Sequence, residues 1–158
     1  MSQPPAGDID QLGILVRVRG RERERQEQAF IACARDHQLR QAELELCRNE
    51  LMSEEQRHEA ALRLRASAPV DALLHDYLIT RHSAIEALSR QELDATDAVR
   101  RTSEDLAKAR SDHHRANLRL DVAENQLDLA RKHKVKQRAR KSDDVSQNGA
   151  LSARGALL

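Results

Sequence analysis

The segment "HRANLRLDVAENQLDLARKH", residues 114–133, decides the fold because small and large apolar residues alternate in it at a regular spacing. The apolar positions are Ala116, Leu120, Ala123, Leu127 and Ala130, separated by four, three, four and three residues. Most residues between them carry a charge or an amide. A mean spacing of about 3.5 residues places all five on one narrow face of a helix, as in a coiled coil. We call this inward-facing row the seam, and alanine in every second layer lets two helices approach closely.

Two such seams run along the chain. The second extends from Leu74 to Ala130 without a slip, and thirteen of its seventeen positions are apolar. The first extends from Ile9 to Arg65, and nine of its seventeen positions are apolar. A polar gap interrupts the first seam at Arg19, Arg23 and Gln26. The two seams are equally long, which predicts two long helices that pack against each other.

A break separates the two seams at "RASAPVD", residues 65–71. Pro69 disfavours a helical conformation at the residue before it, and we expect Ser67 to be the N-cap of the second helix. A short connection makes neighbouring helices antiparallel. We therefore predict an all-α fold in which two long helices form an antiparallel coiled-coil hairpin with a disordered C-terminal tail. The predicted parts are a disordered N-terminus 1–7, a hairpin 8–141 and a flexible tail 142–158. Within the hairpin, helix one spans about 8–66, the hinge 67–69 and helix two about 70–138.

The composition fits long helices and not a rounded core. Charged residues make up 34% of the chain, aromatic residues 1%, and the net charge is +1. The longest uninterrupted apolar run, Leu12–Val16, is far too short to span a bilayer, and the first ten residues lack a secretory signal pattern. We therefore expect a cytoplasmic protein. Cys33 and Cys47 lie on one predicted helix, about 21 Å apart, so they cannot form a disulfide within it and read as small seam residues.

The sequence carries no convincing enzyme site. "HEAAL", residues 58–62, begins like a zinc-protease motif, but Leu62 stands where the second histidine is required. In "DHH", residues 112–114, the three side chains diverge around the helix and cannot share one metal ion. Glycine-rich phosphate loops and nucleophile elbows are also absent from the sequence. We therefore expect a non-enzymatic protein without a cofactor, a metal ion or a small-molecule substrate.

Two basic clusters remain as candidate binding residues. The first contains Arg17, Arg19, Arg21, Arg23 and Arg25. The second, in the run 131–141, contains Arg131, Lys132, Lys134, Lys136, Arg138 and Arg140. An antiparallel hairpin places both clusters near the end that carries the two termini. They form either a solvated charged surface or a docking tip for an acidic partner or a nucleic acid. The basic run has no aromatic residues between its cations to stack on bases, which disfavours nucleic acid.

The opposite end of the hairpin has more apolar residues than a two-helix seam needs. Leu73, Tyr77 and Ile79 fall outside the seam. They either wrap the end of the hairpin or form a second contact surface.

The start "LGILVRVRGRERERQEQAF", the single break near the middle, "DYLITRHSAIEAL" after it and the basic end of the second helix together resemble a known family. They are similar to the central-stalk proteins of type III secretion systems, the YscO/FliJ family (SctO-type), over residues 9–141. The resemblance implies an antiparallel hairpin whose termini-bearing end inserts into the hexameric export ATPase, while its hinge end reaches the export gate at the inner membrane. On this chain the two basic clusters would contact the ATPase, and Leu73, Tyr77 and Ile79 would contact the gate protein or export chaperones. The chain has fewer aromatic residues near the hinge than many members of that family.

The stalk interpretation has two alternatives of a different class. One is a basic coiled coil that binds nucleic acid through the run 131–141. The other is an oligomeric scaffold whose seams pair between chains. Solution mass separates these, because a hairpin within one chain is an elongated monomer of 17.9 kDa.

Overall fold

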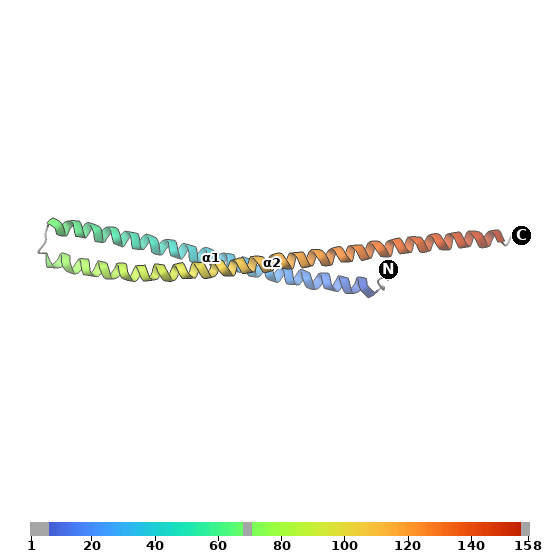
Figure 1. Cartoon of the computed structure of the whole chain (residues 1–158), viewed down its shortest axis with the longest axis horizontal. Helices are drawn as coiled ribbons and strands as arrows, with labels where there is room; N and C mark the ends of the chain where they lie inside the picture. The colour runs from blue at the N-terminus through green and yellow to red at the C-terminus, as the bar shows by residue number, and fades with distance from the viewer. Residues whose placement is uncertain (1–6, 68–70, 156–158) are drawn as a thin grey trace. The chain divides into compact units, whose positions relative to one another are not determined.

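The chain folds into two helices joined by one short connection (Figure 1). The structure, a computed structural model, describes residues 7–67 and 71–155. Helix α1 spans Gly7–Ser67 and helix α2 spans Ala72–Gly155, and no strand occurs within the described ranges. The predicted all-α fold, with two long helices packed against each other as a hairpin, is confirmed. Disorder was predicted for residues 1–7. Residues 1–6 lie outside the described part of the structure, and Gly7 is the first residue of α1.

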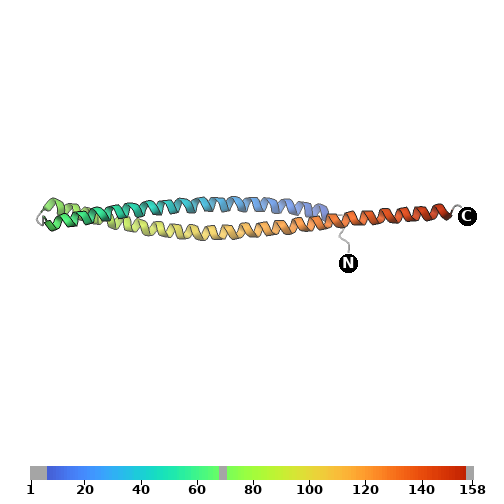
Figure 2. The ribbon, with the colours of Figure 1, turned by 90° about the horizontal axis from the view of Figure 1, so that it is seen from above.

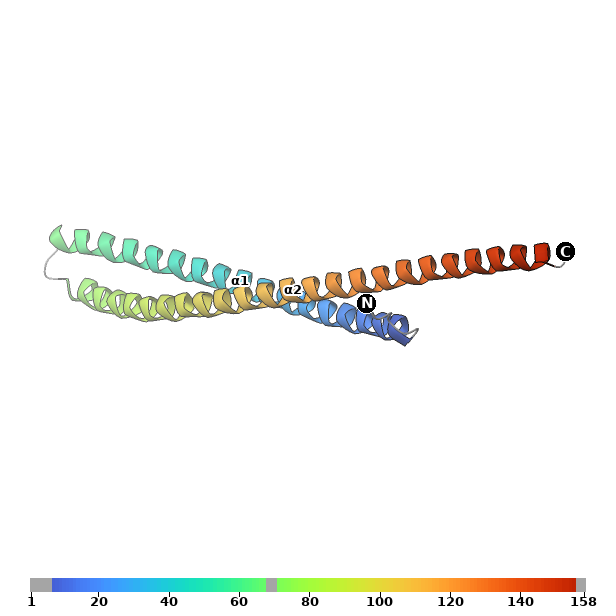
Figure 3. The same ribbon diagram turned by 45° about the vertical axis from the view of Figure 1, so that its right-hand side comes forward.

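The helices form two compact units. Unit 1 contains residues 1–27 and 112–158, and unit 2 contains residues 28–111. Each unit therefore combines one part of α1 with one part of α2, and in Figures 2 and 3 the two parts lie side by side within each unit. In unit 2, contacts join His37 to Thr102 and Arg48 to Glu92. The residue numbers rise along α1 as they fall along α2, so the two helices are antiparallel.

The core of each unit lies on the predicted seams. Among the residues whose burial the structure describes, the buried ones are Leu44, Ala61, Leu78 and Thr102 in unit 2 and Ala116, Ala123 and Leu127 in unit 1. All seven occupy positions of the four-three pattern. In unit 1, the alanine-containing seam of α2 packs against α1 of the same chain.

A polar layer interrupts the seam of unit 2. The Nδ1 atom of His37 lies 3.0 Å from the hydroxyl oxygen of Thr102, which itself donates a hydrogen bond to the Val99 carbonyl at 3.0 Å. Because the hydroxyl has one hydrogen and uses it on Val99, it accepts its bond from a protonated Nδ1 of His37. Three seam positions further along α1, the Cys47 thiol points to the Leu88 carbonyl at 3.7 Å. Cys33 and Cys47 are both free and half-buried, as expected of small seam residues.

The N-cap prediction for α2 was wrong. Ser67 is the last residue of α1, and its hydroxyl donates a hydrogen bond back to the Leu64 carbonyl at 2.8 Å. Asp71 caps α2 instead, because its Oδ1 accepts hydrogen bonds from the backbone N–H groups of Leu73 at 2.9 Å and Leu74 at 3.3 Å. Its carboxylate also suits the positive end of the helix dipole. Of the predicted hinge 67–69, residues 68 and 69 lie outside the described part.

Helix α2 runs further than the sequence analysis expected. Its predicted end was near residue 138, whereas its backbone remains helical to Gly155. No proline occurs after residue 138, and Ala, Leu and Arg at 150–154 favour helix, while Gly149 and the Ser, Asp and Asn residues at 142–148 favour it less. The flexibility predicted for 142–158 stays a prediction.

Candidate functional site

The first arginine cluster lies on α1 in unit 1 and divides into two sets. Arg19 and Arg23 occupy seam positions and are half-buried. Arg17, Arg21 and Arg25 are exposed. The five residues predicted as one docking site therefore do two different things, since two of them belong to the packing between the helices and three belong to the surface.

The two seam arginines fill the polar gap in the first seam. Arg19 donates a hydrogen bond to the Glu22 carboxylate at 2.6 Å, and the Arg23 guanidinium lies 3.6 Å from the Glu27 carboxylate. The Nε atom of Arg23 is buried and finds no hydrogen-bond partner among the described residues. A buried donor without a partner costs roughly 1–3 kcal/mol, so this part of the seam is a weak one.

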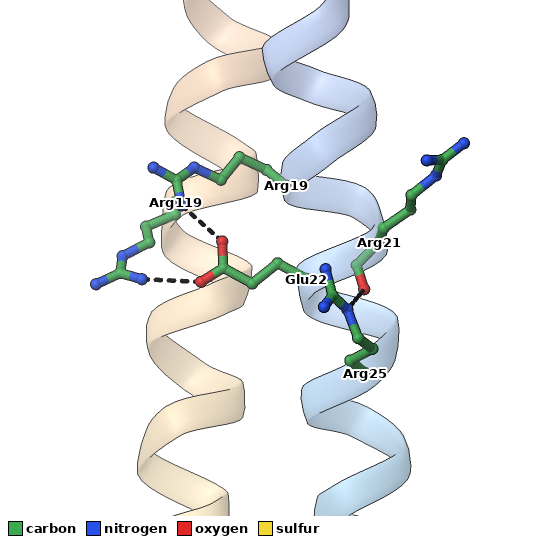
Figure 4. A network of polar contacts seen from close by, with 5 residues as sticks. All are labelled: Arg19, Arg21, Glu22, Arg25 and Arg119. Atoms are coloured by element: carbon green, nitrogen blue, oxygen red, sulfur yellow. Dashed lines mark hydrogen bonds and ion pairs between the residues drawn. The ribbon is translucent and has the colours of Figure 1, made fainter.

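Glu22 links the two helices of unit 1 (Figure 4). Its carboxylate accepts a hydrogen bond from Arg19 at 2.6 Å on one oxygen and from Arg119 of α2 at 2.9 Å on the other. Figure 4 shows the Arg19 side chain crossing from α1 toward α2, so that the two guanidinium groups flank the carboxylate. Two cations share one anion in this network, which leaves a net positive charge on the surface.

The charge network also acts on the acid itself. The hydrogen bond from Arg19 lowers the pKa of Glu22 below its usual 4.5, and the Coulombic attraction of Arg19 and the hydrogen bond from Arg119 add to this effect, while partial desolvation opposes it. Glu22 therefore stays ionised, and the network stays closed, over the physiological pH range.

Arg119 was missed in the sequence analysis although a signal for it was present. Glu22 and Arg119 lie 48 and 49 residues from residue 70, inside the break at residues 65–71. Antiparallel helices joined at one break bring together residues that are equally distant from it. Folding the sequence at residue 70 would thus have placed the two opposite each other.

The surface arginines are available to a partner. Within the part of the chain that the structure describes, the side chains of this set make one hydrogen bond, from Arg25 Nε to the Arg21 carbonyl at 3.3 Å. Within the described residues, Arg17, Arg21 and Arg25 form no ion pair, so their charges are balanced only by solvent and salt.

The second basic cluster lies on α2 in the same unit. Arg131 is 3.8 Å from Asp128, Lys134 is half-buried, and Lys132, Lys136, Arg138 and Arg140 are exposed. From the pairing of Glu22 with Arg119, Gly7 at the start of α1 lies opposite roughly residue 134 of α2. The half of this cluster from Lys136 onward therefore extends past α1, as Figures 1 and 3 show for the red part of α2. The two clusters share one unit but follow each other along it instead of forming one patch.

The two units carry formal charges of opposite sign, which the net charge of the whole chain does not reveal. Unit 1 contains fifteen Lys and Arg against eleven Asp and Glu, a formal charge of +4. Unit 2 contains twelve against fifteen, a formal charge of −3. The overall +1 is thus the sum of a basic unit and an acidic one, and unit 1 attracts acidic surfaces at low ionic strength.

The residues predicted to contact an export gate or a chaperone lie at the start of α2 in unit 2. Leu73, Tyr77 and Ile79 are all exposed, with Leu73 at 81%. The Arg81 guanidinium lies over the Tyr77 ring, 4.8 Å from its centroid, and donates a hydrogen bond to Glu54 of α1 at 2.7 Å. Leu73 and Ile79 therefore do not wrap the end of the hairpin in the described part of the chain, and they remain free for contact.

Two of the histidines considered in the sequence analysis make side-chain contacts. The His58 ring lies 6.1 Å from the His82 ring across the two helices, tilted by 38°, and His113 Nε2 lies 3.4 Å from the Asn117 amide nitrogen on its own helix. Over residues 7–67 and 71–155, no group of three or more His, Cys, Asp or Glu side chains is placed to hold a metal ion.

Within the same two ranges, none of the helices combines the length and the apolar character needed to cross a membrane.

Comparison with known proteins gives no match: none of the family models, curated proteins or solved structures matches this chain. The class of protein that the structure establishes is thus an all-helical, coiled-coil-like hairpin with a basic and an acidic unit.

Proposed function

We propose that this protein is the non-enzymatic central stalk of a bacterial type III secretion export apparatus. In this proposal, unit 1 inserts into the pore of the hexameric export ATPase, and the exposed residues Leu73, Tyr77 and Ile79 contact the export gate protein or an export chaperone. The protein would then act in the cytoplasm at the inner membrane, held there by its partners. The observation that carries the proposal is the concentration of positive charge in unit 1, which contains both chain ends of an antiparallel hairpin.

The contacts of unit 1 suit a partner with sixfold symmetry. A single two-helix pair in a sixfold pore cannot make six equal contacts, so it must touch a few subunits at a time. Long cationic side chains on a narrow helix pair fit such a contact, because they reach different acidic groups without a fixed geometry. Arg17, Arg21 and Arg25 are the best candidates, since they are exposed and form no ion pair among the described residues.

ATP hydrolysis by the matching secretion ATPase, with and without this protein, tests the proposal. The triple variant R17A/R21A/R25A removes three surface charges and leaves the Arg19–Glu22–Arg119 network in place. A matched control, R35A/R90A/R110A, removes three exposed arginines of unit 2 that also form no ion pair among the described residues. We expect the wild type and the control to stimulate hydrolysis and the unit 1 variant to lose the stimulation. The loss should be mimicked by raising the salt concentration.

Two results contradict the stalk proposal. In the first, the wild type neither changes the rate of hydrolysis nor co-elutes with the ATPase on a sizing column. In the second, both triple variants lose stimulation equally, which would make the contact nonspecific.

A second function is favoured by the density of the run 131–141, in which seven of eleven residues are Lys or Arg. A nucleic-acid-binding coiled coil would use these residues as phosphate contacts, and the affinity for DNA or RNA would then fall steeply and linearly with the logarithm of salt concentration. Titration of a labelled duplex at three salt concentrations separates this function from the stalk function, which predicts no binding at physiological salt.

A further inference from the structure

Unit 1 has an apolar groove between its two helices that the proposed function does not use. Its volume is about 300 Å3, and its lining consists of Leu15, Arg19, Leu118, Arg119, Val122, Ala123 and Gln126. Leu118 and Val122 are more than half exposed, and so is Leu129, seven residues after Val122 on the same face of α2. Across the groove, Val18 of α1 is half exposed one turn from Leu15.

The border of this groove is positively charged. Arg19 and Arg119 both line it and share the single carboxylate of Glu22, at 2.6 and 2.9 Å. The exposed Arg25 lies one turn beyond Glu22 on α1. An occupant of the groove therefore needs apolar side chains in the middle and carboxylates at the sides.

The α1 part of unit 2 carries a surface of that kind. Leu39 and Leu46 are exposed, seven residues apart, and thus lie on one face of α1. Asp36, Glu43 and Glu50 form a parallel row beside them at the same seven-residue spacing. Arg40 lies 3.7 Å from Asp36 and 2.8 Å from Glu43. Two carboxylates share one cation here, which is the inverse of the network in unit 1.

The two surfaces match in spacing as well as in charge. Leu39 and Leu46 are as far apart along α1 as Val122, which lines the groove, and Leu129, which lies beyond the lining on the same face, are along α2, about 10.5 Å for seven residues. Equal spacing of apolar residues is what lets side chains of two helices interlock over more than one turn. The opposite formal charges of the two units, +4 and −3, add long-range attraction between them.

We propose that a second copy of this chain docks its Leu39–Leu46 row into the groove of unit 1. The contact joins unit 1 of one copy to unit 2 of another and is distinct from exchange of seams between chains, because both hairpins stay intact. It goes beyond the proposed stalk function and does not depend on it. In a cell it would hold the arginines of unit 1 against an acidic surface until a stronger partner replaced it.

The test is sedimentation velocity of the full chain over a wide concentration range at low salt. We expect a concentration-dependent rise from 17.9 kDa to a larger species, which raising the salt concentration reverses. A groove variant, V122S/L129S, and a row variant, L39S/L46S, should each associate at least about tenfold more weakly than the wild type. The control L93S, which alters an exposed leucine of unit 2 outside both surfaces, should behave as the wild type. Circular dichroism of each variant verifies that the helices are intact.

Mixing the two defective variants gives the decisive result. The groove variant keeps an intact row and the row variant keeps an intact groove, so one copy of each can dock. We expect the mixture to associate more strongly than either variant alone. A wild type that stays monomeric at every concentration overturns the proposal, and so does a mixture that fails to recover association. In the latter case the wild-type association has another contact as its cause.

Discussion

Replacement of Ala116 by leucine tests how closely the helices of unit 1 approach each other. Ala116 is 2% exposed, and it is a seam position one layer away from Leu120. Leucine adds three carbon atoms, which would stabilise the protein by about 0.8 kcal/mol each if space existed for them. A side chain that is already almost fully enclosed has no such space. The added atoms then force the helices apart or the side chain off its rotamer, at a cost of about 1–3 kcal/mol.

Ala123 gives a matched comparison at the next equivalent layer. It is also 2% exposed, but it lines the groove of unit 1, so a leucine at this position can turn into open space. We therefore expect A116L to destabilise the protein more than A123L. The exposed Ala107 is the control, because A107L changes only helix propensity and should stay within about 0.5 kcal/mol of the wild type.

Thermal unfolding followed by circular dichroism measures these differences. For a chain of this length, about 1–3 kcal/mol corresponds to a fall in Tm of roughly 2–12 °C. If A116L is as stable as the wild type or more stable, the close approach inferred from the alanine layers is refuted. Equal losses for A116L and A123L would contradict the role given to the groove.

Three further predictions concern capping, pH and helix strength. Asp71→Ala should lower stability by about 1 kcal/mol because two backbone N–H groups of α2 lose their acceptor, while Ser67→Ala should change Tm little. The pKa values of Glu22 and Glu54 are lowered in the folded state, each chiefly by a hydrogen bond from an arginine. The ionised carboxylates therefore stabilise the folded state above the unfolded pKa near 4.5, and this stabilisation is lost as the pH falls through the lower pKa of the folded state. In acid, the Tm of Glu54→Gln should thus fall less steeply with pH than the Tm of the wild type. Gly20→Ala should raise stability by roughly 0.5–1 kcal/mol, since a Cβ there meets no atom within 4 Å, and an unchanged or lower denaturation midpoint in urea would contradict this.

The sequence was sufficient for the fold because the seam depends on a repeated pattern and not on any one residue. All seven buried residues lie on the two rows read from the four-three spacing. Local signals were less reliable at the break, where Ser67 and Asp71 are both good caps. The choice between them depends on where the chain leaves α1, and the hydroxyl of Ser67 is already bonded to the Leu64 carbonyl. The predicted end of α2 near residue 138 followed the change in composition after Lys141, whereas the backbone of α2 remains helical to Gly155.

The candidate site could be predicted only in part, because its residues were counted along one helix at a time. Five arginines were recognised on α1 as one cluster, but their burial depends on the facing helix. Seam geometry turns Arg19 inward to Glu22, and the same register brings Arg119 across from α2. The groove beside this network could not be found from either helix alone, since its walls come from both.

The packing between the two helices of unit 1 contributes less stability than their length suggests, and this affects which partners the unit can bind. Its α1 part carries the polar gap of the seam, two glycines within the helix and the unpartnered Nε atom of Arg23. Its α2 part supplies the alanine layers, which bury less apolar area than leucine layers would. A helix pair held this weakly separates or shifts at a low free-energy cost. Positive charge and weak packing thus coincide in one unit. That combination suits a surface that has to adapt to several acidic partners in turn, because each new contact then competes with little internal stability.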